Sequence, residues 1–147
     1  MACPDGTASG HRRGSGDEER QRPIRVVLDT SAIIEFTRQS IHVGELIAEV
    51  DDEQCAVGIS VISVAEALHS VADPDRLDLL VDHHATVVLS ADAADWRALA
   101  ATYDLVGRLD TAAAALAAID HDCAVLTRQT SLYAGLAGGG PVIPIED

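Results

Sequence analysis

Lysine is absent from this chain of 147 residues, and all ten of its basic residues are arginines. Acidic residues number 24, which leaves a net charge of −14 at pH 7. The first 23 residues hold four arginines and four acids, so residues 24–147 carry the whole negative excess. Such a body repels nucleic acid at long range unless cations or a basic partner intervene. The composition disfavours a simple nucleic-acid-binding module but is compatible with a metal site built from carboxylates.

Aromatic residues, cysteines and long apolar runs are also scarce. Aromatic residues make up 3% of the chain. Cys3, Cys55 and Cys123 lie far apart, which fits neither a zinc site nor the framework of a disulfide-rich domain, and we expect the last two to be small core residues. No apolar stretch is long enough to span a bilayer, and the N-terminal segment lacks a signal-peptide pattern. The sequence therefore predicts a cytoplasmic protein with no membrane-spanning segment.

The chain is nevertheless rich enough in aliphatic residues to bury a core. Its hydrophobic content is 48%, mostly Ala, Val, Leu and Ile. Residues 1–23 are polar, rich in Gly and Arg and without periodicity, which predicts a flexible N-terminal tail. Residues 24–147 are long enough for one domain.

Strand-like and helix-like patterns alternate along that domain. Short apolar runs predict strands at residues 24–28, 56–59, 87–89 and 124–127, with a further edge strand at 142–145. Apolar residues at helical spacing predict helices at residues 31–39, 42–50, 75–84, 91–105 and 110–121. Another helix begins after Ser60 or Ser63, and Ser63 with Glu66 matches a capping box. This alternation predicts an α/β fold with a mostly parallel sheet of four to five strands and helices on both faces.

Three acids fall at special places in this layout. Asp29 ends the first strand, Glu66 lies one turn into the helix after the second strand, and Asp110 begins the helix before the fourth. Strand ends and helix starts meet at one edge of a parallel sheet, where ligands bind. Three carboxylates brought together repel one another, and a divalent cation relieves that repulsion. Oxygen-only ligands suit Mg²⁺ or Mn²⁺ rather than Zn²⁺.

Each acid also has a purely structural explanation. Asp29 alone could cap a helix, Glu66 could complete a capping box, and Asp110 could be a first-turn acid that the helix dipole favours. Their common position at one sheet edge favours the metal site.

Four ordered segments of the chain resemble the PIN domain, and most of all the small VapC-type toxins of bacterial toxin–antitoxin pairs. They read VVLDTSA (26–32), ISVAEAL (62–68), RLDTAAAALA (108–117) and AVLTR (124–128). The resemblance covers about residues 24–147 and implies a PIN-like fold and a Mg²⁺- or Mn²⁺-dependent endoribonuclease. It also implies an RNA substrate, a small antitoxin whose basic tail enters an acidic pocket, and a homodimer formed through helices. Asp29, Glu66 and Asp110 match the first three acids of the family.

The fourth acidic position of the family departs from the pattern, because this chain has Gln129 there. Gln129 can offer a carbonyl oxygen but adds no charge. Ser31 and Thr127 are candidates for hydroxyl contacts to ligand water, and Arg128 for pairing with a carboxylate or a substrate phosphate. The departure leaves an alternative open, in which a degenerate PIN fold acts as a non-catalytic binding protein.

Other enzymes built on an aspartate after a strand fit less well. Haloacid-dehalogenase-type phosphatases have Asp-x-Asp, whereas the second position here is Ser31. Phosphoacceptor receiver domains have a late lysine, which this chain lacks.

Overall fold

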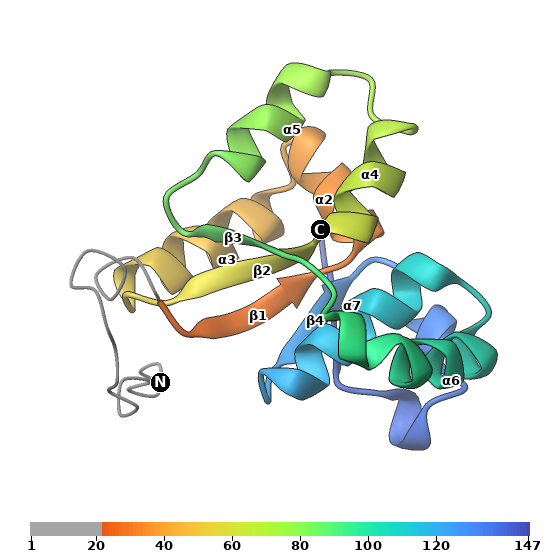
Figure 1. Ribbon diagram of the computed structural model, residues 1–147. Helices are drawn as coiled ribbons and strands as arrows, with labels where there is room; N and C mark the ends of the chain where they lie inside the picture. Colours follow the sequence, from red (N-terminus) through yellow and green to blue (C-terminus); the bar gives the residue numbers. More distant parts are fainter. Residues whose placement is uncertain (1–21) are drawn as a thin grey trace.

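The computed structural model describes residues 22–147, so most of the predicted tail, residues 1–23, lies outside the described residues. A five-stranded, all-parallel sheet in the order β3-β2-β1-β4-β5 forms the centre of this part (Figure 1). Its strands are β1 (Ile24–Leu28), β2 (Ala56–Ser60), β3 (Thr86–Leu89), β4 (Ala124–Thr127) and β5 (Val142–Pro144). The predicted parallel α/β sheet is confirmed.

Six α-helices in the described part cover the two faces of the sheet (Figure 1). They are α2 (Thr30–Thr37), α3 (Ile41–Asp52), α4 (Val61–Leu68), α5 (Pro74–Val81), α6 (Trp96–Val106) and α7 (Leu109–Asp120). The helix predicted at residues 91–105 begins later, because Asp92 caps a separate 3-10 turn, Ala93–Asp95, by accepting a hydrogen bond from the Ala94 N–H.

Side chains of the central strands alternate between two cores, as the pleat of a strand requires. Val26 and Leu28 of β1 pack with residues of α2, α3, α4 and α5 on one face. Val27 points to the other face and packs with Val125 and with Tyr133, beside the alanines of α7. All three β1 residues are fully buried, so β1 is covered on both faces, as expected for the middle strand of a parallel sheet.

The helix after β2 begins directly at the end of the strand. Ser60 has extended backbone angles, and its Oγ accepts a hydrogen bond from the Ile62 N–H at 3.1 Å. Ser63 instead lies inside α4, fully buried, and its hydroxyl has no hydrogen-bond partner. The predicted capping box of Ser63 and Glu66 is therefore wrong, since the cap lies one turn earlier.

Two further features bear on the sequence predictions. None of the helices formed by residues 22–147 is long and apolar enough to cross a bilayer. Cys55 lies in the core, as expected, and Cys123 is a partly buried free thiol. At the start of the described part, the Arg22 guanidinium binds the Asp51 carboxylate at 2.8 Å and the Cys55 carbonyl at 3.2 Å.

Gly135 gives a direct test of the packing between α6 and the turn that follows β4. A methyl group on Gly135 would collide with the backbone carbonyl of Leu105, near the end of α6. We expect Gly135→Ala to lower the free energy of unfolding by about 1–3 kcal/mol, the usual cost of overpacking. Gly44, an exposed helical position with open space around it, is the matched control. Gly44→Ala should raise stability by about 0.5–1 kcal/mol, because alanine loses less entropy in a helix.

Urea denaturation of both variants measures the difference. A Gly135→Ala protein as stable as the wild type would show that this close approach does not constrain the fold.

Candidate functional site

Asp29 directly follows β1 and is the N-cap of α2, so its two sequence interpretations describe the same residue. Its Oδ1 accepts hydrogen bonds from the Ala32 N–H at 3.0 Å and the Ser31 hydroxyl at 2.7 Å. Its Oδ2 accepts one from the Tyr133 hydroxyl at 2.7 Å. The carboxylate is only 3% exposed, and these three donors offset the cost of burying its charge.

Tyr133 is fitted for this role by its surroundings. Its side chain is fully buried, and burial, followed by the negative charge of Asp29, raises the pKa of Tyr133 well above its usual value. The phenol therefore stays protonated at physiological pH and donates to Asp29.

Asp110 lies in the first turn of α7, where it is 6% exposed. The Arg108 guanidinium donates two hydrogen bonds of 3.1 Å to its carboxylate, from Nε to Oδ1 and from Nη2 to Oδ2. The Thr30 hydroxyl adds a bond of 2.6 Å to Oδ2. Burial alone would raise the pKa of Asp110, but the bonds from Arg108 and Thr30 and the charge of Arg108 outweigh it, so the pKa is lowered. Asp110 is thus held as a carboxylate.

Glu66 completes the set from the exposed side of α4. With Asp29 and Asp110 it lines a cleft of about 190 Å³. The other residues that line this cleft are Thr30, Ser31, Ile34, Ser70, Arg108, Thr111, Gln129 and Leu132. The structure therefore brings the three predicted acids to one cleft beside the carboxyl end of β1.

The cation in this cleft is Arg108. Its hydrogen bonds to Asp110 and the negative charge of Asp110 raise the pKa of Arg108, and the charges of Glu66 and Asp29 raise it further. In residues 22–147, no three acidic, histidine or cysteine side chains are arranged to hold a metal ion. The donor set, which is carboxylate oxygen, fits Mg²⁺ or Mn²⁺ chemically. Asp29, Glu66 and Asp110 are the residues that would hold such an ion.

The supporting hydroxyls form a chain of hydrogen bonds that ends at Asp29. The Gln129 N–H donates to Thr127 Oγ1 at 2.9 Å, and Thr127 Oγ1 lies 3.3 Å from Ser31 Oγ. Because Ser31 gives its only hydroxyl proton to Asp29, Thr127 is the donor in the contact between them. Thr127 is fully buried, so it contributes to the site by holding Ser31 and the Gln129 backbone in place. Gln129, in contrast, is one of the residues that line the cleft, at the position where the family pattern has an acid.

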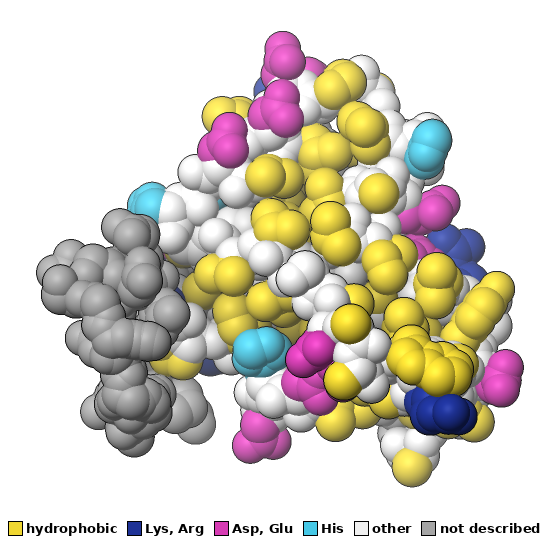
Figure 2. Space-filling view, viewed as in Figure 1, with side chains coloured by type: hydrophobic (Ala, Val, Ile, Leu, Met, Phe, Trp, Pro, Cys, Tyr) yellow, Lys and Arg dark blue, Asp and Glu magenta, His cyan; other side chains and the backbone are white. Residues whose placement is uncertain are grey.

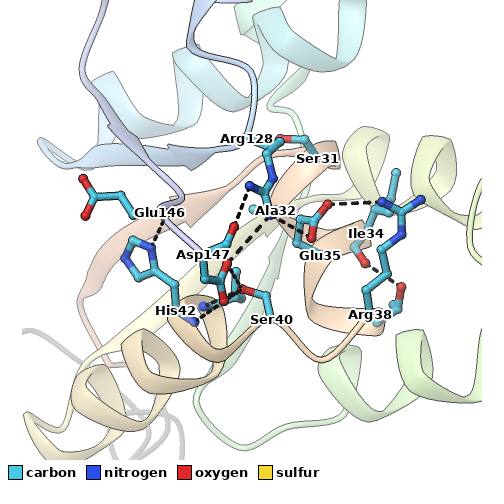
Figure 3. Close-up of polar contacts among 12 residues, drawn as sticks. Ser31, Ala32, Ile34, Glu35, Arg38, Ser40, His42, Arg128, Glu146 and Asp147 are labelled. Carbon is cyan, nitrogen blue, oxygen red and sulfur yellow. Dashed lines mark hydrogen bonds and ion pairs between the residues drawn. The ribbon is translucent and has the colours of Figure 1, made fainter.

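Arg128 does not belong to the cleft. Its guanidinium binds Glu35 at 3.0 Å and the carbonyl oxygen of Asp147 at 2.9 Å (Figure 3). The Asp147 carboxylate in turn accepts from the Ser40 hydroxyl and the His42 N–H, at the N-terminus of α3. Of the two roles expected for Arg128, the structure places it in the carboxylate pair. Only its backbone N–H reaches the site, where it donates to Ser31 Oγ at 2.8 Å.

Sequence reasoning missed three residues that shape the site. Arg108 and Thr30 immobilise Asp110, and Tyr133 immobilises Asp29. For Arg108 and Thr30 a signal existed, since each lies within two positions of a predicted site residue. Tyr133 offered none, because its contact with Asp29 spans 104 positions of sequence.

A larger cavity of about 470 Å³ lies away from these acids, between the segment that leads into α6 and the outer side of α7. Its lining includes Leu89, Trp96, Leu99 and Leu116, with Asp92, Asp95 and Asp120 among them. No predicted site residue contributes to it.

These features define a PIN-like fold with an acidic cleft at the carboxyl end of its central strand. The structure is similar to PAE2754 from Pyrobaculum aerophilum, with a TM-score of 0.60 and 16% sequence identity over 84% of this chain and 90% of that one. At this identity the likeness concerns the fold alone. Comparison of the sequence with models of protein families gives no match. Comparison with curated proteins gives none either.

The Tyr133–Asp29 hydrogen bond generates a stability prediction. Tyr133→Phe removes one of three donors to a buried carboxylate without changing the ring. We expect a loss of about 1–3 kcal/mol in the free energy of unfolding at neutral pH, the cost of leaving a charged group short of a partner. Tyr103→Phe, at a position that is 45% exposed, is the control and should change stability by less than about 0.5 kcal/mol.

Urea titrations of the two variants provide the comparison. Equal, small effects would mean that the phenol contributes little to holding Asp29.

Proposed function

We propose that this protein is a metal-dependent endoribonuclease and the toxin of a toxin–antitoxin pair. One observation supports this above the others: Asp29, Glu66 and Asp110 line one cleft next to the carboxyl end of β1. The PIN-like fold, which is typical of nucleases, agrees with it.

Each carboxylate has a definite part in this proposal. Asp29 and Asp110 are the fixed ligands, because hydrogen bonds hold both side chains in place. Glu66 is exposed and approaches from a different element, so it is the adaptable ligand. When bound, Mg²⁺ or Mn²⁺ supplies an activated water and stabilises charge on a phosphodiester. Gln129 lines the same cleft and offers an amide that can orient water without adding charge.

The proposal meets an electrostatic obstacle in the negative charge of the domain. RNA approaches a chain with a net charge of −14, and Arg108 is the only basic residue among the described residues that line the cleft. Divalent cations reduce this repulsion, so we expect the activity to need them for substrate binding as well as for chemistry.

An RNA-cleavage assay tests the proposal. With Mg²⁺ or Mn²⁺, the wild-type protein should cleave structured RNA. Asp29→Asn should lower the rate by at least about 100-fold, because the metal ion that stabilises charge on the phosphodiester would lose a charged ligand. Gln129→Asp, which restores the fourth acid of the family pattern, should cleave at least as fast as the wild type. Equal cleavage by wild type and Asp29→Asn would refute the proposal.

A second candidate function is binding without catalysis. The bidentate pair of Arg108 and Asp110, and Gln129 at the fourth position, favour it, since both reduce the tendency of the cleft to take up a metal ion. In this case no metal-dependent thermal shift would occur, and RNA would remain intact with every variant.

Charge and exposed apolar surface also support the expected partners. A small antitoxin with a basic segment would complement the negative surface, and such complementarity speeds association. For the expected second copy of the chain, the supporting observation lies on another part of the surface. Figure 2 shows apolar side chains gathered over the face that carries α4, α5, β3 and α6. The large apolar residues exposed on α4, β3 and α6 are Val61, Leu68, Val88, Trp96, Tyr103 and Leu105.

We infer that this apolar face joins two copies of the chain. Light scattering at micromolar concentration should give twice the mass of the 15.4 kDa chain. Leu68→Glu, which places a charge at a position that is 53% exposed, should give a folded monomer, because a buried unpaired charge is costly. Leu109→Glu, at another exposed apolar position, is the control and should remain dimeric. A monomeric wild type would contradict the dimer.

A further inference from the structure

Arg108 lies where the proposed function requires a divalent ion. Its guanidinium binds both oxygens of Asp110 at 3.1 Å. The negative charges of Glu66 and Asp29 also stabilise its positive charge. A planar guanidinium matches the two oxygens of a carboxylate and forms the strongest kind of side-chain pair. The chain thus supplies its own cation to the three acids.

This ion pair is not a requirement of the helix on which it lies. Arg108 occupies the N-cap position of α7, but its side chain makes no capping hydrogen bond. The side chain is 48% exposed, whereas that of Asp110 is 7% exposed. Arg108 can therefore leave Asp110 by rotating into solvent, without unpacking the core, whereas Asp110 is buried and remains bound to the Thr30 hydroxyl.

We propose that Arg108 is a resident counter-ion of the carboxylate cleft, which a divalent metal ion must displace from Asp110 in order to bind. Arg108 then sets the affinity of the site for metal and offsets part of the negative charge of the three acids until the ion arrives. The proposal rests on the proposed function only in taking a divalent ion as the ligand, and it does not depend on RNA being cleaved.

The first test measures Mn²⁺ binding by calorimetry on the full chain at low ionic strength. Arg108→Gln should bind Mn²⁺ at least about ten-fold more tightly than the wild type, because charge-assisted hydrogen bonds no longer compete with the ion. Arg97→Gln is the matched control, since it removes one positive charge from an exposed arginine that lies over Trp96, outside the cleft. It should bind Mn²⁺ as the wild type does.

Two further variants separate charge from geometry. Arg108→Lys keeps the charge but loses the two-pronged contact, so its affinity for Mn²⁺ should lie between those of the wild type and Arg108→Gln. Asp110→Asn removes the carboxylate for which the guanidinium and the ion compete. Adding Arg108→Gln to Asp110→Asn should therefore tighten Mn²⁺ binding by much less than the ten-fold expected in the wild-type background.

The second test observes the side chain itself by NMR. The Nε–H signal of Arg108 should shift when Mg²⁺ saturates the wild-type protein, and the Nε–H signal of Arg97 should not. Wild-type affinity in Arg108→Gln, no Mn²⁺ binding by any of the proteins, or an unchanged Arg108 signal at saturation would each overturn the proposal. Tighter binding by Arg108→Gln without any RNA cleavage would uphold it and refute only the nuclease.

Discussion

The burial of the Asp29 charge at the end of β1 is the constraint on which the rest of the site depends. An ionised carboxylate that is 3% exposed persists in a fold only with donors around it. Two parts of the chain supply them: the start of α2, through the Ala32 N–H and the Ser31 hydroxyl, and the distant Tyr133. The strand, the helix after it and the turn after β4 are thereby fixed relative to one another. The relative positions of these three elements determine the shape of the cleft.

Local patterns were sufficient to predict the architecture of the described domain. Buried parallel strands appear in a sequence as short apolar runs, and β1 and β4 match their predicted bounds. The starts of helices were less accessible, because several serines or aspartates near a strand end compete as caps. Ser60 rather than Ser63 is the cap, because the backbone turns into the helix directly at the end of β2, which no local pattern specifies.

The three acids of the site were predictable from the sequence, but the groups that offset their charge were not. Strand ends and helix starts converge at one edge of a parallel sheet, so the positions of Asp29, Glu66 and Asp110 place them in one cleft. What neutralises them depends on rotamers and on contacts between distant residues. Arg128, adjacent to β4, turns outward to Glu35, while Arg108, two residues from Asp110, turns inward. The sequence contains both arginines but no information on which way each side chain turns.

The ends of the sheet have a consequence for how the protein can associate. The outer strands β3 and β5 have only four and three residues, and β5 ends in Pro144, which has no N–H to donate. Short edges and proline discourage the pairing of strands between molecules, which otherwise leads to aggregation. Growth of the sheet beyond its own chain is thus restricted at both sides, and specific assembly is left to the side chains of the helices.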